Sequence, residues 1–285
     1  MQKKAKEQWD VIVKSETRLF DFRFRELFKS KELIAVLVKR DFVSVYKQTI
    51  LGPLWFVIQP LMTTIMYTFV FGNIAKMSTS GLPQTLFYFS GTMLWTFFST
   101  NLIKSSDTFI SNAPMFSKIY FPRLALPLSY VITHLRTFLI QLAVLLVLMG
   151  YFAANGQFTF VFSAHLLLIP LLILQTTILS IGVGILISAF TTKYRDLRHL
   201  VTFGITLWMY VTPVVYPLQQ VPAKFRALYK VNPVAPIFEA FRFSLLGAGS
   251  FSWPVWGVSV AASILVFLMG VILFNRTARN FVDVI

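Results

Sequence analysis

Long apolar runs alternate with short polar segments along most of this chain. A transmembrane α-helix needs about 20 mainly apolar residues, because each residue advances the helix by about 1.5 Å and lipid offers no partner for a free backbone amide. We predict that six segments cross a bilayer: Leu51–Ile74, Thr85–Leu102, Leu128–Tyr151, Leu166–Phe190, Leu200–Tyr216 and Pro254–Phe274. The pattern therefore predicts an all-α integral membrane protein, with a six-span domain over residues 51–285.

The segment before the first predicted span, Leu33–Ile50, has two different faces when it is placed on a helix. One face carries the polar residues Arg40, Ser44 and Lys47, and the opposite face carries the apolar or aromatic residues Val38, Phe42, Val45 and Tyr46. An amphipathic helix of this kind lies along a membrane surface, with its cations near anionic headgroups. We therefore predict that residues 1–50 form a cytoplasmic tail and an interface helix.

Residues 217–250 lie between the fifth and sixth predicted spans and contain two helical pieces separated by Asn232, Pro233 and Pro236. Neither piece is long enough to cross a bilayer, and proline interrupts a helix. We predict a re-entrant helical hairpin whose charged side chains face water or headgroups. An ordinary extracellular loop with an amphipathic helix is the alternative interpretation.

The basic residues indicate the orientation in the membrane. The net charge is +15, and the 26 Lys and Arg residues are unevenly distributed. With six spans both termini share one side, and only five basic residues, Lys76, Lys224, Arg226, Lys230 and Arg242, fall on the other, which leaves 21 on the side of the termini. By the positive-inside rule we predict cytoplasmic termini. This distribution is typical of a membrane protein and not of a nucleic-acid-binding groove.

Reactive groups are scarce in this sequence. It has no cysteine and neither a Gly-x-x-x-x-Gly-Lys-[Ser/Thr] nor a Gly-x-Gly-x-x-Gly motif, so we predict no catalytic residue, metal or cofactor on this chain. Beyond position 50 the acids are Asp107, Asp196, Glu239 and Asp283, all at span ends or in loops. The ionisable residues His134 and Arg136 lie near a span end, where we expect them to reach toward the headgroups. A membrane glycosyltransferase or acyltransferase, a lesser alternative, would need a cluster of acids or histidines.

Aromatic residues are abundant in the predicted spans. Lipid-facing packing and interfacial belts explain most such residues. Aromatic rings also suit a sugar path, because the apolar face of a pyranose can stack on a ring and slide along it. We take as candidate channel residues Trp55, Tyr67, Phe89, Trp95, Phe98, Trp208 and Tyr210.

Three segments resemble the permeases of polysaccharide-exporting ABC transporters, which move O-antigen, capsule or teichoic acid. They are RDFVSVYKQTILGPLWFVIQPLMTTIMYTFVFG (40–72), FPRLALPLSYVITHLRTFLI (121–140) and TPVVYPLQQVPAKFRALYKVNPVAPIFEAFR (212–242). They look like that family's interface helix with its first span, its approach to the third span, and its fifth span with the outer gate. The likeness covers nearly the whole chain after about residue 30.

The resemblance implies a homodimer in the bacterial inner membrane, driven by two copies of a separate ATPase that binds ATP and magnesium. The implied substrate is a lipid-linked polysaccharide on an undecaprenyl-type carrier, above all O-antigen. Teichoic acid, capsule, a lipid or a drug are the alternatives. Arg40 and Lys47 would attract the anionic headgroup. The cytoplasmic residues expected to couple to the ATPase are Asp41, Lys118, Arg123, Tyr194, Arg195, Asp196 and Arg198.

Overall fold

In the computed structural model the described part of the chain is helical and contains no β-strand. The structure describes residues 27, 30–47, 49–116, 121–191, 194, 196–225, 229 and 231–280. Its helices are α2 (Lys31–Tyr46), η1 (Gly52–Leu54), α3 (Trp55–Tyr67), the π-helix η2 (Thr68–Ile74), α4 (Gln84–Ser106), α5 (Thr108–Ser111), α6 (Ala113–Phe116), α7 (Ala125–Ala154), η3 (Ala164–Leu167), α8 (Leu168–Thr191), α9 (Leu197–Tyr210), η4 (Leu218–Gln220), η5 (Ala223–Phe225), α11 (Ala235–Leu246) and α12 (Trp253–Asn280).

Within these residues, four continuous helical segments are long and apolar enough to cross a membrane. They are Gly52–Ile74, Ala125–Ala154, Ala164–Thr191 and Trp253–Thr277. Each coincides within a few residues with the first, third, fourth or sixth predicted span, except that α12 continues six residues beyond the predicted end of the sixth span. The protein is therefore a multi-pass membrane protein by length and composition of its helices.

The other two predicted spans have a different character. Helix α4 has 23 residues, but hydroxyl and amide side chains interrupt its apolar surface. Helix α9 has only 14 residues and ends at Tyr210, six residues before the predicted end of the fifth span. Pro213, which cannot supply a helical amide hydrogen, follows shortly after this end. At about 1.5 Å per residue α9 is shorter than the bilayer core. The count of six spans stays a prediction.

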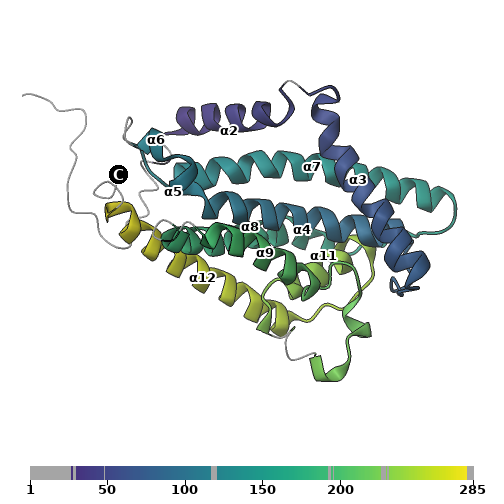
Figure 1. Cartoon of the computed structure of the whole chain (residues 1–285). Helices are drawn as coiled ribbons and strands as arrows, with labels where there is room; N and C mark the ends of the chain where they lie inside the picture. The colour runs from purple at the N-terminus through teal and green to yellow at the C-terminus, as the bar shows by residue number, and fades with distance from the viewer. Residues whose placement is uncertain are drawn as a thin grey trace, which may run out of the picture.

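Helix α4 lies at the centre of the bundle and packs against α3, α7, α8 and α9, while α8 also packs closely along α12 (Figure 1). Glycine permits the close approach of α8 and α12. A Cβ atom on Gly182 would lie 2.7 Å from the Cα atom of Phe267, and Gly270 faces the carbonyl oxygen of Gly182. Small residues at such crossings let helix backbones come together where lipid gives no hydrophobic drive.

Helix α2 packs lengthwise along the first half of α7 (Figure 1). Its residues Ile34, Leu37 and Val38 are buried in a cluster with Leu126 and Tyr130 of α7. The polar face expected from the sequence is present, because Arg40 and Ser44 are exposed. Part of its apolar face, however, is covered by α7 and not by lipid.

Helix α11 is buried along most of its length, between α4, α8 and α12. The expectation that Arg242 faces water or headgroups is wrong, because only 2% of this residue is exposed. Its guanidinium group donates hydrogen bonds to the carbonyl oxygens of Pro213 and Val214 and lies 3.9 Å from the ring centre of Phe87. Arg242 thus satisfies two backbone carbonyls of the non-helical segment that follows α9.

Candidate functional site

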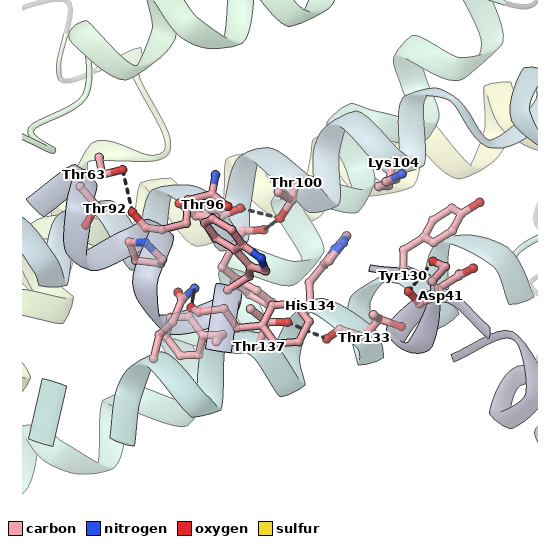
Figure 2. Close-up of a pocket in the computed structure, with 18 of the residues that line it drawn as sticks. Asp41, Thr63, Thr92, Thr96, Thr100, Lys104, Tyr130, Thr133, His134 and Thr137 are labelled. Atoms are coloured by element: carbon pink, nitrogen blue, oxygen red, sulfur yellow. Dashed lines mark hydrogen bonds between the residues drawn. The ribbon is translucent and has the colours of Figure 1, made fainter. Parts of the chain in front are cut away.

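A cavity of about 540 Å³ lies between α2, α3, α4 and α7, and we call it the threonine groove. Figure 2 shows six threonine side chains along it, from Thr63 and Thr92 at one end through the middle of the groove. The other end lies beside Tyr130, Asp41 and Lys104. The six threonines are Thr63, Thr92, Thr96, Thr100, Thr133 and Thr137.

Most of these threonine hydroxyls donate a hydrogen bond to a backbone carbonyl of their own helix. Thr92 donates a hydrogen bond to the carbonyl oxygen of Tyr88 (2.9 Å), Thr100 to that of Thr96 (2.5 Å) and Thr133 to that of Ser129 (3.0 Å). Such bonds to the preceding turn make a threonine compatible with an apolar environment. Each hydroxyl oxygen still has acceptor capacity for another donor. The groove therefore offers acceptors without a fixed charge along its middle.

Charged side chains gather at one end of the groove. Arg40 of α2 pairs with its neighbour Asp41, with 2.7 Å between Nη2 and Oδ1. The exposed Lys104, near the end of α4, belongs to the same lining and forms no ion pair within the part of the chain that is described. This end of the groove can attract an anion, while the opposite end offers hydroxyl and amide groups.

His134 differs from the expectation that it reaches toward the headgroups. Its Nδ1 atom lies 2.7 Å from Oδ1 of the fully buried Asn101 on α4, so the imidazole ring bridges α7 and α4. Because an amide oxygen only accepts hydrogen bonds, Nδ1 is assigned as the donor, which leaves Nε2 as an acceptor in the neutral ring. Arg136, two residues further on, is exposed as expected.

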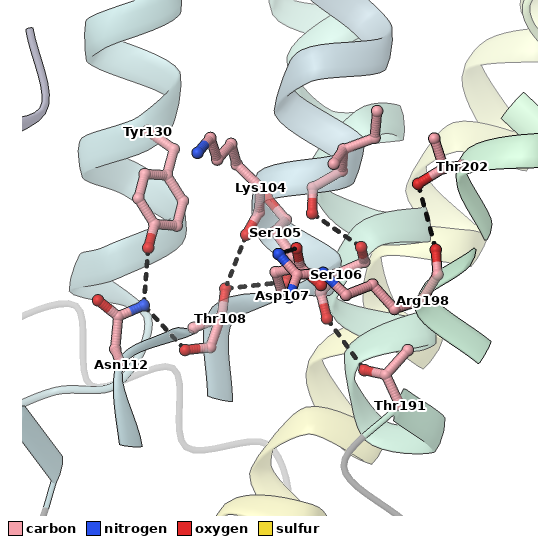
Figure 3. A network of polar contacts seen from close by, with 11 residues as sticks. Lys104, Ser105, Ser106, Asp107, Thr108, Asn112, Tyr130, Thr191, Arg198 and Thr202 are labelled. Carbon is pink, nitrogen blue, oxygen red and sulfur yellow. Dashed lines mark hydrogen bonds and ion pairs between the residues drawn. The ribbon is translucent and has the colours of Figure 1, made fainter. Parts of the chain in front are cut away.

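A second group of polar residues joins the ends of several helices (Figure 3). Arg198, at the start of α9, forms an ion pair with the buried Asp107 that follows α4, at 2.9 Å. Thr191 at the end of α8 donates to the carbonyl oxygen of Ser106, at 3.0 Å. Asn112 donates to the hydroxyl oxygen of Tyr130 on α7, at 2.8 Å. We call these contacts the helix-end network. It lies at the end of the bundle where α5, α6 and the C-terminal end of α12 meet (Figure 1).

The candidate channel residues fall in different environments. Phe89 and Phe98 are fully buried and Trp95 nearly so, and they pack inside the bundle around α4. Phe98 makes an edge contact with the partly buried Trp208, with 5.3 Å between ring centres. Trp55 and Tyr210 are exposed, and Tyr67 is partly buried. Trp55 alone of the seven lines the threonine groove.

The residues predicted to bind the headgroup or to couple to the ATPase also lie in different places. Arg40 and Asp41 line the groove, whereas the exposed Lys47, which follows the end of α2, lies outside this lining. Tyr194 and Asp196 are exposed beside the helix-end network, and Arg198 belongs to it, while Arg123 is partly buried before α7. Lys118 and Arg195 lie outside the described residues.

Sequence reasoning missed the main features of both sites. Thr96, Thr100, Thr133 and Thr137 repeat at helical spacing of about four residues, a signal that was available in the sequence. Nothing in the sequence indicates that the two threonines of α4 and the two of α7 line the same groove. The pairing of Asp107 with Arg198 likewise joins residues that are far apart in the sequence.

Comparison with known proteins gives the family. Residues 32–246 match the ABC-2 type transporter family, which is well over half of the chain. The chain belongs to this family. An ABC-2 type chain is a transport subunit that works with an ATPase, which agrees with the absence of a phosphate-binding loop from the sequence.

Relatives of this ABC-2 type chain occur in Klebsiella pneumoniae and Myxococcus xanthus. It is 28% identical over 255 residues to an O-antigen export system permease protein RfbA of Klebsiella pneumoniae. These aligned residues cover 89% of this chain and 95% of the relative. It is 28% identical over 221 residues to a protein of the same name in Myxococcus xanthus, with 76% and 82% covered. The resemblance found in the sequence is confirmed.

Proposed function

We propose that this protein is the membrane permease of an ABC transporter that exports a lipid-linked polysaccharide, O-antigen above all, across the bacterial inner membrane. The single observation that carries this proposal is the similarity to O-antigen export permeases over 89% of the chain. Other polymers, such as capsule or teichoic acid, a lipid or a drug stay open as substrates. In this proposal two copies of the chain assemble, each with six spans and cytoplasmic termini.

The threonine groove supports a role in binding the substrate. Its charged end, with Arg40 and Lys104, suits the anionic phosphate groups of a lipid carrier, and Lys47 lies near the end of the same helix as Arg40. Its hydroxyl-rich middle suits sugar hydroxyl groups, which both donate and accept hydrogen bonds. In our proposal the carrier phosphates rest at the charged end while the first sugars lie against the threonines.

Exposed apolar and aromatic side chains support the proposal that two copies of the chain assemble. Phe203, Leu207 and Tyr210 of α9 and Phe69 of η2 each expose half or more of their surface. In a homodimer such faces would line a channel between the two copies or contact lipid. We keep Trp55, Tyr67, Trp208 and Tyr210 as the channel-facing aromatic residues of this proposal. Phe89, Trp95 and Phe98 would support them from the bundle interior.

The helix-end network supports coupling to two ATPase subunits, which would hold the ATP and magnesium. Asp107 and Arg198 connect the segment after α4 to the start of α9. The predicted docking residues Tyr194 and Asp196 lie directly before α9 and are exposed. Movement of a docked ATPase would therefore reach α9 through a short path. Asp41, Lys118, Arg123 and Arg195 complete the proposed docking surface.

Replacing Thr100 and Thr133 together by valine tests the groove. Valine keeps the shape of threonine and removes the hydroxyl group. We expect export to fall about tenfold or more, because each lost hydrogen bond to substrate contributes about 1 kcal/mol. The double serine variant should restore export. Thr176→Val is the control, because Thr176 makes the same kind of bond in α8, to Leu172 at 2.7 Å, away from the groove. The readout is surface polysaccharide in a strain that lacks its own permease.

Normal export by the double valine variant, at normal protein levels, would contradict the groove as the substrate path. Failure of the wild-type chain with its ATPase to export any O-antigen would contradict the proposed substrate instead. The two outcomes are separate, because the second does not involve the groove variants.

A further inference from the structure

A second cavity, of about 350 Å³, lies where the start of α11, η4 and the start of α12 meet. Its lining includes Tyr229, Glu239, Phe251, Val255 and Trp256. Most of the lining is apolar, and the aromatic rings form part of its wall. It does not overlap the threonine groove or the helix-end network. It lies at the opposite end of α12 from that network (Figure 1).

One carboxylate faces this cavity. Glu239 is only 4% exposed, and its Oε2 atom accepts a hydrogen bond of 3.3 Å from the backbone amide of Ser250. A carboxylate has about four acceptor positions, so most of its capacity is unused. Among residues with described positions, no cationic side chain lies within ion-pair distance of Glu239. Arg242, one turn further on α11, attracts Glu239 only through space, because its guanidinium hydrogens are directed to Pro213 and Val214.

The aromatic wall is held rigidly. The indole nitrogen of Trp256 donates to Oε1 of Gln175 at 2.9 Å. The amide nitrogen of Gln175 in turn donates to Ser259 at 2.8 Å. Phe251 stacks on Phe243, with 5.9 Å between ring centres and 15° between ring planes. Because these rings already have fixed positions, a ligand would not lose free energy by ordering them.

A buried carboxylate beside aromatic rings is complementary to an ammonium group. The carboxylate supplies the opposite charge and accepts hydrogen bonds, and the ring faces attract a cation. A neutral sugar fits less well, because most of its hydroxyl groups would be buried against apolar atoms without a partner. The chemistry of the cavity therefore selects a small primary ammonium.

The surroundings of the cavity indicate that a lipid carries this group. Val255 lines the cavity and is also 48% exposed, so the lining continues onto the outer surface of α12. Trp253 and Val258 expose still more of their surface on the same apolar helix. Tryptophan is typical of the headgroup level of a membrane. An acyl chain can follow this surface while the headgroup enters the cavity.

We propose that this cavity binds the ammonium headgroup of a phosphatidylethanolamine-type lipid, with Glu239 as the anionic partner and Trp256 and Phe251 as the aromatic wall. The bound headgroup would contact both α11 and η4, so it would hold the segment between α9 and α12 against α12. This inference needs only a bilayer around α12 and is independent of the exported substrate.

Lipid retention measured on the whole purified chain tests the proposal. The chain is equilibrated in nanodiscs with phosphatidylethanolamine, N-acetylated phosphatidylethanolamine or phosphatidylglycerol, and the lipids that remain bound are counted by native mass spectrometry. We expect phosphatidylethanolamine to be retained about tenfold or more over the other two, since a hydrogen-bonded charge pair is lost with either of them. Glu239→Gln should abolish this preference. Glu32→Gln, which removes an exposed acid on α2, should leave it unchanged.

Equal retention of the acetylated and the unmodified lipid by the wild-type chain would overturn the proposal, and this result does not depend on how any variant folds. A preference that survives in a folded Glu239→Gln variant would also overturn it. Displacement of the lipid by soluble glucosamine would assign the cavity to an amino sugar and refute the lipid. The assay contains neither ATPase nor polysaccharide, so its failure is distinguishable from failure of the export function.

Discussion

The ion pair between Arg198 and Asp107 should respond differently to the loss of each partner. Its N–O distance is 2.9 Å, and 51% of the Arg198 side chain but only 8% of the Asp107 side chain is exposed. Two unit charges at this distance attract each other by about 6 kcal/mol at an effective dielectric constant of about 20. Exposure of the arginine and the cost of removing the carboxylate from water reduce the net contribution to about 1–2 kcal/mol.

The two single substitutions should therefore have different costs. Arg198→Gln leaves a buried carboxylate whose other oxygen, Oδ1, has no hydrogen-bond partner among the described residues, so we expect a loss of about 2–3 kcal/mol in the free energy of unfolding. Asp107→Asn leaves an arginine that can turn toward water, so its loss should be about 1 kcal/mol. The double variant should lose less than the sum of both, by about 1–2 kcal/mol.

Unfolding in mixed micelles, followed by circular dichroism, measures these differences. Arg40→Gln is the comparison variant: Asp41 also has one oxygen, Oδ2, without a hydrogen-bond partner among the described residues, but its side chain is 20% exposed against 8% for Asp107. Its loss should stay below about 1 kcal/mol. Equal losses for Arg198→Gln and Asp107→Asn, or additive losses in the double variant, would refute the interpretation of Asp107 as a buried charge that depends on Arg198.

Three further predictions concern packing, coupling and the aromatic path. Gly182→Val should lower the free energy of unfolding by about 2–3 kcal/mol in the same assay, because its side chain meets the backbone of α12, whereas Gly257→Val has open space around it and should be nearly neutral. Reversing the charges of Arg195 and Asp196 together should lower export while ATP hydrolysis by the reconstituted complex continues; a parallel loss of both would contradict a coupling role. Trp55→Ala should lower export without changing unfolding, since Trp55 is exposed, and normal polysaccharide export would remove it from the proposed path.

The sequence predicts the long apolar helices well, for a physical reason. The segments around α3, α7, α8 and α12 are mainly apolar over a length that can cross a bilayer, so mean hydropathy alone identifies them. The amphipathic pattern of α2 also predicts its helix, but the pattern does not say whether α7 or lipid covers its apolar face. Local composition identifies elements and leaves their partners open.

The features that the sequence does not predict depend on contacts between different helices. Hydropathy treats Arg242 as a surface residue, yet hydrogen bonds to carbonyl oxygens in the non-helical segment after α9 compensate for its burial. Threonine has little effect on the mean hydropathy of a span, and its hydroxyl group can bond to its own helix. Mean hydropathy therefore does not reveal that these threonines line a common groove. His134 is bonded to Asn101, a residue 33 positions away, and a scan of neighbouring residues cannot detect this.

Helix α9 is attached near both of its ends, while much of the surface between them is free. Near its start Arg198 is tied to Asp107, and near its end Trp208 donates a hydrogen bond of 3.1 Å to Asn232, the residue that also bonds to Thr212. Phe203, between these two anchors, is 63% exposed. We expect a helix attached at both ends to move as a rigid body, because its backbone hydrogen bonds resist a change in its length. A displacement of the segment around Asp107 would then also displace the segment around Asn232.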